Sequence, residues 1–216
     1  MMNELKKRIY TSLALFILMF LMFINNYISA YFLTILGILS LLEFFKTNTI
    51  IYKKSKNKQL IINLFFICYI FFFCYLFIIL SSTLHLKVLL FIILITCVAS
   101  DIGGLFFGKI LKGPKLTIIS PKKTVSGSIG SLIFSTTVFS YLIFFFTNNF
   151  SLIIVCTGLI ISIGCQLGDL FFSYIKRKAL LKDFANYLPG HGGVLDRVDG
   201  ILLGIPLGFL SLMIFY

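Results

Sequence analysis

Polar residues of three kinds gather in segment 173–199 of a chain that is otherwise mostly apolar. Five basic residues, three aspartates and three glycines occur in this segment. Carboxylates hold hard cations such as Mg²⁺, Lys and Arg bind phosphate oxygens, and glycines let a backbone approach a ligand. These are the parts that a site for phosphoryl or nucleotidyl transfer requires. The charged members are Lys176, Arg177, Lys178, Lys182, Asp183, Asp196, Arg197 and Asp199.

A second polar segment, 101–126, contains a run that could hold phosphate. Two lysines and two hydroxyl residues come directly before a Ser-x-Gly sequence, at which an apolar run begins. This order favours a phosphate-binding loop at a helix N-terminus, which we call the phosphate cradle. A basic patch that only touches lipid headgroups is the alternative. Gly103 to Lys109 copies the start of a P-loop, but Ile110 follows and an apolar run precedes it, so we reject a P-loop. The run itself is Ser120, Pro121, Lys122, Lys123 and Thr124.

A third feature is Asp169, which follows Gln166 and Gly168 at the end of an apolar run. A carboxylate there is costly unless it meets water or partners, so it is a candidate functional residue. The alternative is a carboxylate that only reaches the membrane surface.

The composition is that of a membrane protein. Hydrophobic residues make up 59% of the 216 residues, charged residues 12%, and the mean hydropathy is +1.06. These values exclude an ordinary soluble domain. The net charge of +12 lies in short polar segments, so anionic lipids and nucleotide phosphates are expected as partners rather than nucleic acid. The five cysteines lie in apolar runs without a CxxC pair and are expected to be small core residues.

Apolar runs predict a single-domain, all-α polytopic bundle over 1–216 with about seven transmembrane helices. With the N-terminus in the cytosol, 18 of the 19 Lys and Arg residues lie on the cytosolic side, and Lys87 is the exception. All five aspartates then lie on that side too, so the site is predicted to be cytosolic. The predicted spans are 9–24, 27–45, 59–80, 84–100, 127–147, 150–172 and 200–216, of which the first is short.

The polar segments resemble the phosphatidate cytidylyltransferase (CDP-diacylglycerol synthase) family. Segment 173–199 follows its signature of Ser, Lys-Arg, Lys-Asp, His-Gly-Gly and Asp-Arg-x-Asp, and Gly168-Asp169-Leu170 also matches. Further matches in the first polar segment are Asp101, Gly108, Lys109, Ser120, Pro121, Lys123 and Thr124. The chain departs from the family at Ser126 and Phe172, where the family has glutamates.

The resemblance implies transfer of the cytidylyl group of CTP to phosphatidate, with Mg²⁺ as the expected cofactor, and it leaves the presence of a second cation open. It implies Asp169 and Asp196 as metal ligands, assisted by Asp199. Nucleotide phosphates are assigned to Ser120, Lys122, Lys123 and Thr124, and the lipid phosphate to Ser173, Lys176, Arg177 and Arg197. Lys182, Asp183, His191, Gly192 and Gly193 are expected to shape the loop around the substrates.

Three other functions stay open at this point. A CTP-dependent lipid or polyprenol kinase would release CDP instead of pyrophosphate. A transporter or channel would carry charged residues in the middle of its spans, and an inactive relative is suggested by Ser126 and Phe172. We expect a multi-pass protein of a bacterial inner membrane, and the resemblance suggests a homodimer.

Overall fold

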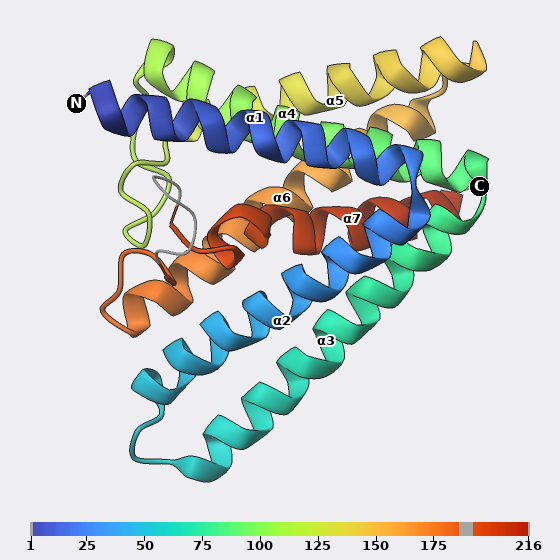
Figure 1. Ribbon diagram of the computed structural model, residues 1–216. Coiled ribbons are helices and arrows are strands. Elements are labelled where there is room, and N and C mark those ends of the chain that lie inside the picture. The colour runs from blue at the N-terminus through green and yellow to red at the C-terminus, as the bar shows by residue number, and fades with distance from the viewer. Residues whose placement is uncertain (1, 186–191, 216) are drawn as a thin grey trace. The chain divides into compact units, whose positions relative to one another are not determined.

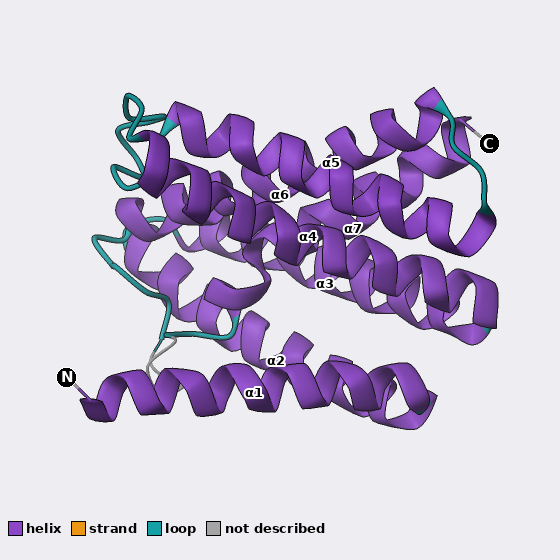
Figure 2. Cartoon of the chain, turned by 90° about the horizontal axis from the view of Figure 1, so that it is seen from above, coloured by secondary structure: helices purple, strands orange, loops and turns teal. Residues whose placement is uncertain are grey.

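The computed structural model describes residues 2–185 and 192–215 (Figure 1). Within these ranges the chain is helical, without strands, and its extended contacts include the isolated antiparallel bridge between Lys115 and Thr124 (Figure 2). The helices are α1 Met2–Ile24, α2 Asn26–Ile51, α3 Lys56–Ser82, α4 Leu84–Leu111, α5 Val125–Thr147, α6 Leu152–Lys178 and α7 Leu195–Phe215.

Six of these helices, α2 to α7, are long and apolar enough to cross a membrane. The predicted all-α, multi-pass architecture is therefore confirmed. The described side chains of α1 include a shorter apolar stretch, Leu13–Ile24, so a seventh span through α1 stays a prediction.

Three helices that carry site residues extend further than the sequence pattern predicted. Segment 101–111 was expected to be part of a polar loop, yet α4 continues to Leu111. The reason is packing: a Cβ atom at Gly103 would lie 3.0 Å from the carbonyl oxygen of Gly130, so this glycine lets α4 approach α5 closely. Similarly, α6 continues to Lys178 and α7 begins at Leu195, which places several predicted loop residues on helices.

The contacts divide the chain into two compact units. Unit 1 comprises Met1–Lys87 and Ile175–Val198, and unit 2 comprises Val88–Tyr174 and Asp199–Tyr216. The helices α4, α6 and α7 each contribute residues to both units.

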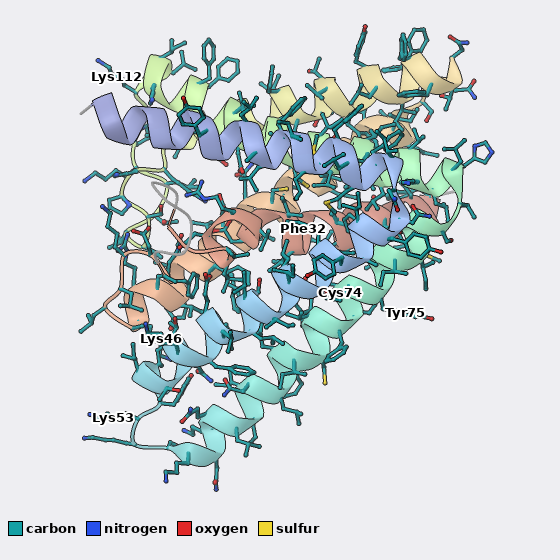
Figure 3. All side chains as sticks on the ribbon, in the orientation of Figure 1. Phe32, Lys46, Lys53, Cys74, Tyr75 and Lys112 are labelled. Carbon is teal, nitrogen blue, oxygen red and sulfur yellow. The ribbon has the colours of Figure 1, made fainter. Side chains whose placement is uncertain are left out.

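In unit 1, α2 and α3 form an antiparallel hairpin (Figure 1). The Phe44 and Phe66 rings stack with their centroids 3.8 Å apart, and Asn48 donates a 2.7 Å hydrogen bond to the Asn63 side chain. Lys46 and Lys53 lie near the end of the hairpin where α2 leads into α3 (Figure 3). Buried amide and aromatic contacts of this kind fix one helix against the other in an apolar environment.

In unit 2, small residues allow close helix packing. The buried hydroxyls of Ser100, Ser131 and Ser162 connect α4, α5 and α6, with oxygen–oxygen distances of 2.6 Å from Ser100 to Ser131 and 3.0 Å from Ser100 to Ser162. Interhelical hydroxyl pairs and small side chains are how helices associate where apolar burial gives no advantage over lipid.

In unit 2, α6 packs closely against the backbone of α7 at Gly168, and this contact makes a testable prediction. A Cβ atom there would contact the carbonyl oxygen of Asp199 and lie 3.2 Å from the Cα atom of Gly200. Gly168→Ala should therefore lower the free energy of unfolding by about 1–3 kcal/mol through overpacking. Denaturant unfolding in detergent micelles would measure this change.

Gly104→Ala is the matched control, because a Cβ atom there would lie no closer than 3.7 Å to the atoms of α5. Both substitutions gain the same helix propensity. Equal stability of the two variants would contradict the close packing described at Gly168.

Candidate active site

The side chain of Asp196 connects three parts of unit 1. Its Oδ1 atom lies 2.6 Å from the ammonium of Lys176, and its Oδ2 atom accepts hydrogen bonds from the backbone N–H groups of Phe184 at 2.9 Å and Gly193 at 3.0 Å. The Asp196 side chain is 4% exposed and that of Lys176 12%. The ammonium and the two backbone N–H groups replace the water molecules that this carboxylate loses on burial.

The glycines of the His-Gly-Gly run have a backbone role in this arrangement. Gly192 has a φ of +81°, a left-handed conformation that favours glycine. A Cβ atom at Gly193 would lie 2.6 Å from Oε2 of Glu43. In the structure these glycines therefore make room for carboxylates of the protein itself, and their predicted contact with substrate stays a prediction.

The basic end of α6 is held by local contacts in unit 1. The Lys176 ammonium lies 5.2 Å from the centroid of the buried Phe184 ring. Arg177 donates to the carbonyl oxygen of Leu181 at 3.2 Å, and Lys178 donates to the hydroxyl of Tyr52 at 3.2 Å. Cations near a helix C-terminus are favoured by the helix dipole, so the Lys-Arg-Lys sequence stabilises this helix end while it presents positive charge.

In unit 2, the predicted phosphate cradle is an ordered loop. The Thr124 hydroxyl caps α5 by accepting the N–H of Gly127 at 3.1 Å, and the N–H of Lys123 donates to the carbonyl of Ser120 at 3.0 Å. The Lys123 ammonium lies 2.6 Å from Oδ2 of Asp169. The structure thus joins two features that the sequence predicted separately, the cradle and the carboxylate of α6.

Asp169 and Asp199 lie at the same helix crossing in unit 2. A Cβ atom at Gly200 would be 3.6 Å from Oδ1 of Asp169, and Gly168 packs against the backbone of Asp199. One turn away, Gly204 packs against the sulfur of Cys165. Small residues therefore bring the parts of α6 and α7 that carry Asp169 and Asp199 into close contact.

The described residues of each unit contain no group of three His, Cys, Asp or Glu side chains placed to hold a metal ion. Unit 2 contributes Asp169 and Asp199, whose oxygens are donors that suit Mg²⁺. Asp196 belongs to unit 1 and has its own set of partners. The donor chemistry fits the expected ion, and the site of three aspartates stays a prediction.

The remaining predicted residues are placed as follows. Ser173 lies partly buried on α6, and Arg197 lies exposed on α7. Lys122, Lys182 and Asp183 are exposed loop residues, which leaves their side chains accessible to a ligand. His191 lies outside the described residues.

Sequence reasoning missed Glu43, which lies near the end of the predicted span 27–45. Its side chain is 1% exposed, and its two carboxylate oxygens accept the N–H groups of Val194 and Leu195, each at 2.8 Å. The sequence does contain a signal for its importance, because Glu43 is the one acidic residue between Glu4 and Asp101. An ionisable residue within an apolar span is a functional candidate by default.

Fold and site together define a multi-pass membrane protein with lysine–carboxylate pairs and a glycine-rich turn. The model of the cytidylyltransferase family matches residues 2–215. The chain belongs to this family.

Curated relatives are phosphatidate cytidylyltransferases of bacteria. That of Helicobacter pylori (strain J99 / ATCC 700824) is 38% identical over 112 residues, which cover 52% of this chain and 42% of the relative. That of Rickettsia bellii (strain RML369-C) is 43% identical over 120 residues, covering 50% and 51%. That of Staphylococcus haemolyticus (strain JCSC1435) is 42% identical over 110 residues, covering 50% and 42%. The chain thus spans about half the length of these relatives.

The burial of the Lys176–Asp196 pair predicts a large effect on stability. Lys176→Met leaves the Asp196 carboxylate without its cation and should lower the free energy of unfolding by about 3–5 kcal/mol. Lys182→Met, which removes an exposed lysine from the same segment, should change it by about 0.5 kcal/mol or less. Unfolding in detergent micelles compares the two variants, and similar losses would contradict the role given to the pair.

Proposed function

We propose that this protein transfers the cytidylyl group of CTP to phosphatidate, giving CDP-diacylglycerol and pyrophosphate. Membership of the cytidylyltransferase family and the names of the relatives support this reaction. The structural observation that supports it most directly is the ion pair between Lys123 of the phosphate cradle and Asp169 of α6. That contact joins a group suited to phosphate with a group suited to a cation.

The chemistry asks mainly for electrostatic compensation. The phosphate of phosphatidate is already anionic at neutral pH, so it needs no strong general base before it attacks the α-phosphorus of CTP. The difficulty is repulsion between two anions, which fixed positive charge reduces. We assign Lys122 and Lys123 to the nucleotide phosphates, and Lys176, Arg177 and Arg197 to the lipid phosphate.

The other members of the site support these contacts. Ser120 and Thr124 would donate hydroxyl hydrogen bonds to the nucleotide, and Ser173 would donate to the lipid phosphate. Lys182, Asp183 and His191 would shape the loop. Thr124 accepts the N–H of Gly127 and lies 3.1 Å from the Ser126 hydroxyl, so its own hydroxyl hydrogen can donate either to Ser126 or to a bound nucleotide.

A magnesium ion is part of the proposal. Asp169 and Asp199 would hold it, and Asp196 would contribute if one of its present partners is released. When bound, Mg²⁺ would neutralise charge on the nucleotide phosphates and on the leaving pyrophosphate. The ion pair between Lys123 and Asp169, with the two atoms 2.6 Å apart, supports this assignment because a positive charge already lies beside this carboxylate.

The proposed orientation places the site at the cytosolic face of a bacterial inner membrane. Successive spanning helices alternate in direction, so segments 52–55, 112–124 and 179–194 would return to one face. Those segments and the adjoining helix ends contain most of the lysines, which indicates the cytosolic side. The acyl chains of phosphatidate would then stay in the bilayer while its headgroup meets cytosolic CTP.

The position of the transferred phosphorus tests the reaction. Protein reconstituted in vesicles that contain phosphatidate should move label from α-³²P-CTP into lipid and release pyrophosphate. Chelation of divalent ions should stop the transfer, and Asp169→Asn should slow it by about 10²- to 10³-fold, the loss typical of one preorganised electrostatic group. Label transfer from γ-³²P-CTP with release of CDP would instead establish a lipid kinase.

A further inference from the structure

We propose that Glu43 is a positioning residue, which holds the first turn of α7 and thereby sets the place of Asp196. Glu43 lies on α2, and the two backbone N–H groups that it accepts, those of Val194 and Leu195, lie at the start of α7. All three residues belong to unit 1. The contact is therefore part of one compact body and connects chain positions about 150 residues apart.

The contact meets two requirements at once. A carboxylate that is 1% exposed needs hydrogen-bond donors to replace water. The first N–H groups of a helix have no partner within the helix and favour an anion. Glu43 supplies that anion from another helix, so the start of α7 is capped by a side chain of α2 rather than by a neighbour in sequence.

Asp196 extends the same arrangement. Its Oδ2 atom accepts the N–H of Gly193, so three consecutive N–H groups, from Gly193 to Leu195, donate to two carboxylates of the protein. The turn cannot shift along either carboxylate without breaking at least one of these bonds. Asp196 is itself bound to Lys176, which lies at the end of α6.

Glu43 is in turn held firmly by α2 and α3. Phe44, the next residue, stacks on Phe66, and Asn48 donates to Asn63 at 2.7 Å. A Cβ atom at Gly193 would lie 2.6 Å from Glu43 Oε2, so the carboxylate has little room on the side of the turn. The α2–α3 hairpin therefore acts as the support from which Glu43 fixes the turn.

Glutamine at position 43 is the sharpest test. An amide keeps the shape of the side chain, but its NH₂ group donates and cannot accept one of the two N–H groups. Hydrogen exchange of the 193–195 amides, followed by mass spectrometry in detergent, should become faster in Glu43→Gln than in the wild type. Ser40→Ala is the matched control, since it removes a buried hydroxyl of α2 that has no hydrogen-bond partner among the described residues and so takes no part in holding Glu43 or the turn.

The effect on turnover rests on the proposed function. In Glu43→Gln the kcat for CDP-diacylglycerol formation should fall about 10- to 100-fold, as for other residues that orient a ligand-binding carboxylate. The KM for CTP should stay within about twofold, because Glu43 holds the turn of unit 1 whereas the residues assigned to CTP belong to unit 2. In Ser40→Ala the kcat per folded protein should stay close to that of the wild type.

The outcomes separate the two proposals. Unchanged exchange at 193–195 in Glu43→Gln overturns the positioning role, and so does faster exchange with unchanged kcat. If the wild type forms no CDP-diacylglycerol, the proposed function fails while the exchange result still decides whether Glu43 holds the turn. Should Glu43→Gln not accumulate, Glu43→Asp replaces it, because its shorter side chain keeps the charge yet cannot reach both amides; normal exchange in that variant overturns the role.

Discussion

Asp196 accepts one ammonium and two backbone N–H groups although its side chain is almost fully withdrawn from water. A carboxylate in that position is tolerated only where its lost hydration is replaced. The polar part of unit 1 is arranged to meet this requirement. Lys176, the N–H of Phe184 and the turn at Gly193 are all fixed by the same two oxygens. Groups that could bind an anionic substrate are thereby held in place before any substrate arrives.

The second constraint is close packing of helices through small residues. Gly168 and Gly200 let α6 and α7 approach until Asp169 and Asp199 lie at one crossing, and the three-serine contact keeps α4, α5 and α6 together. In an apolar solvent such contacts replace the hydrophobic effect as the source of helix association. The geometry of the carboxylates therefore depends on residues that carry no charge.

Much of this could be predicted from the sequence. Long apolar runs predict spanning helices because the bilayer sets their length, and the spacing of lysines, aspartates and glycines indicates phosphate chemistry. The ends of the helices were harder to predict from the sequence. For example, α4 continues through Asp101 because Gly103 packs against α5, and no local sequence pattern reveals that contact. Glu43 was missed for the same reason, since its partners are about 150 residues away.

The environment of Lys87 is also determined by residues that are distant in the sequence. It was the one basic residue that the predicted orientation left on the outer side. In the structure it is 8% exposed, donates to Asn26 at 2.6 Å and lies 5.6 Å from the centroid of the Phe23 ring. An ammonium with an amide and an aromatic face as partners is stabilised without an anionic surface, which explains the exception.

The proposed function requires that the loops containing Lys54, Lys115 and Lys182 all face the same side of the membrane. Cysteine accessibility tests it most directly, in a background with the five native cysteines replaced. Lys54→Cys, Lys115→Cys and Lys182→Cys, all at exposed positions, should react with a membrane-impermeant maleimide from the same side, and Asn149→Cys from the opposite side. Labelling of any of the first three from the side that labels Asn149→Cys would contradict the account.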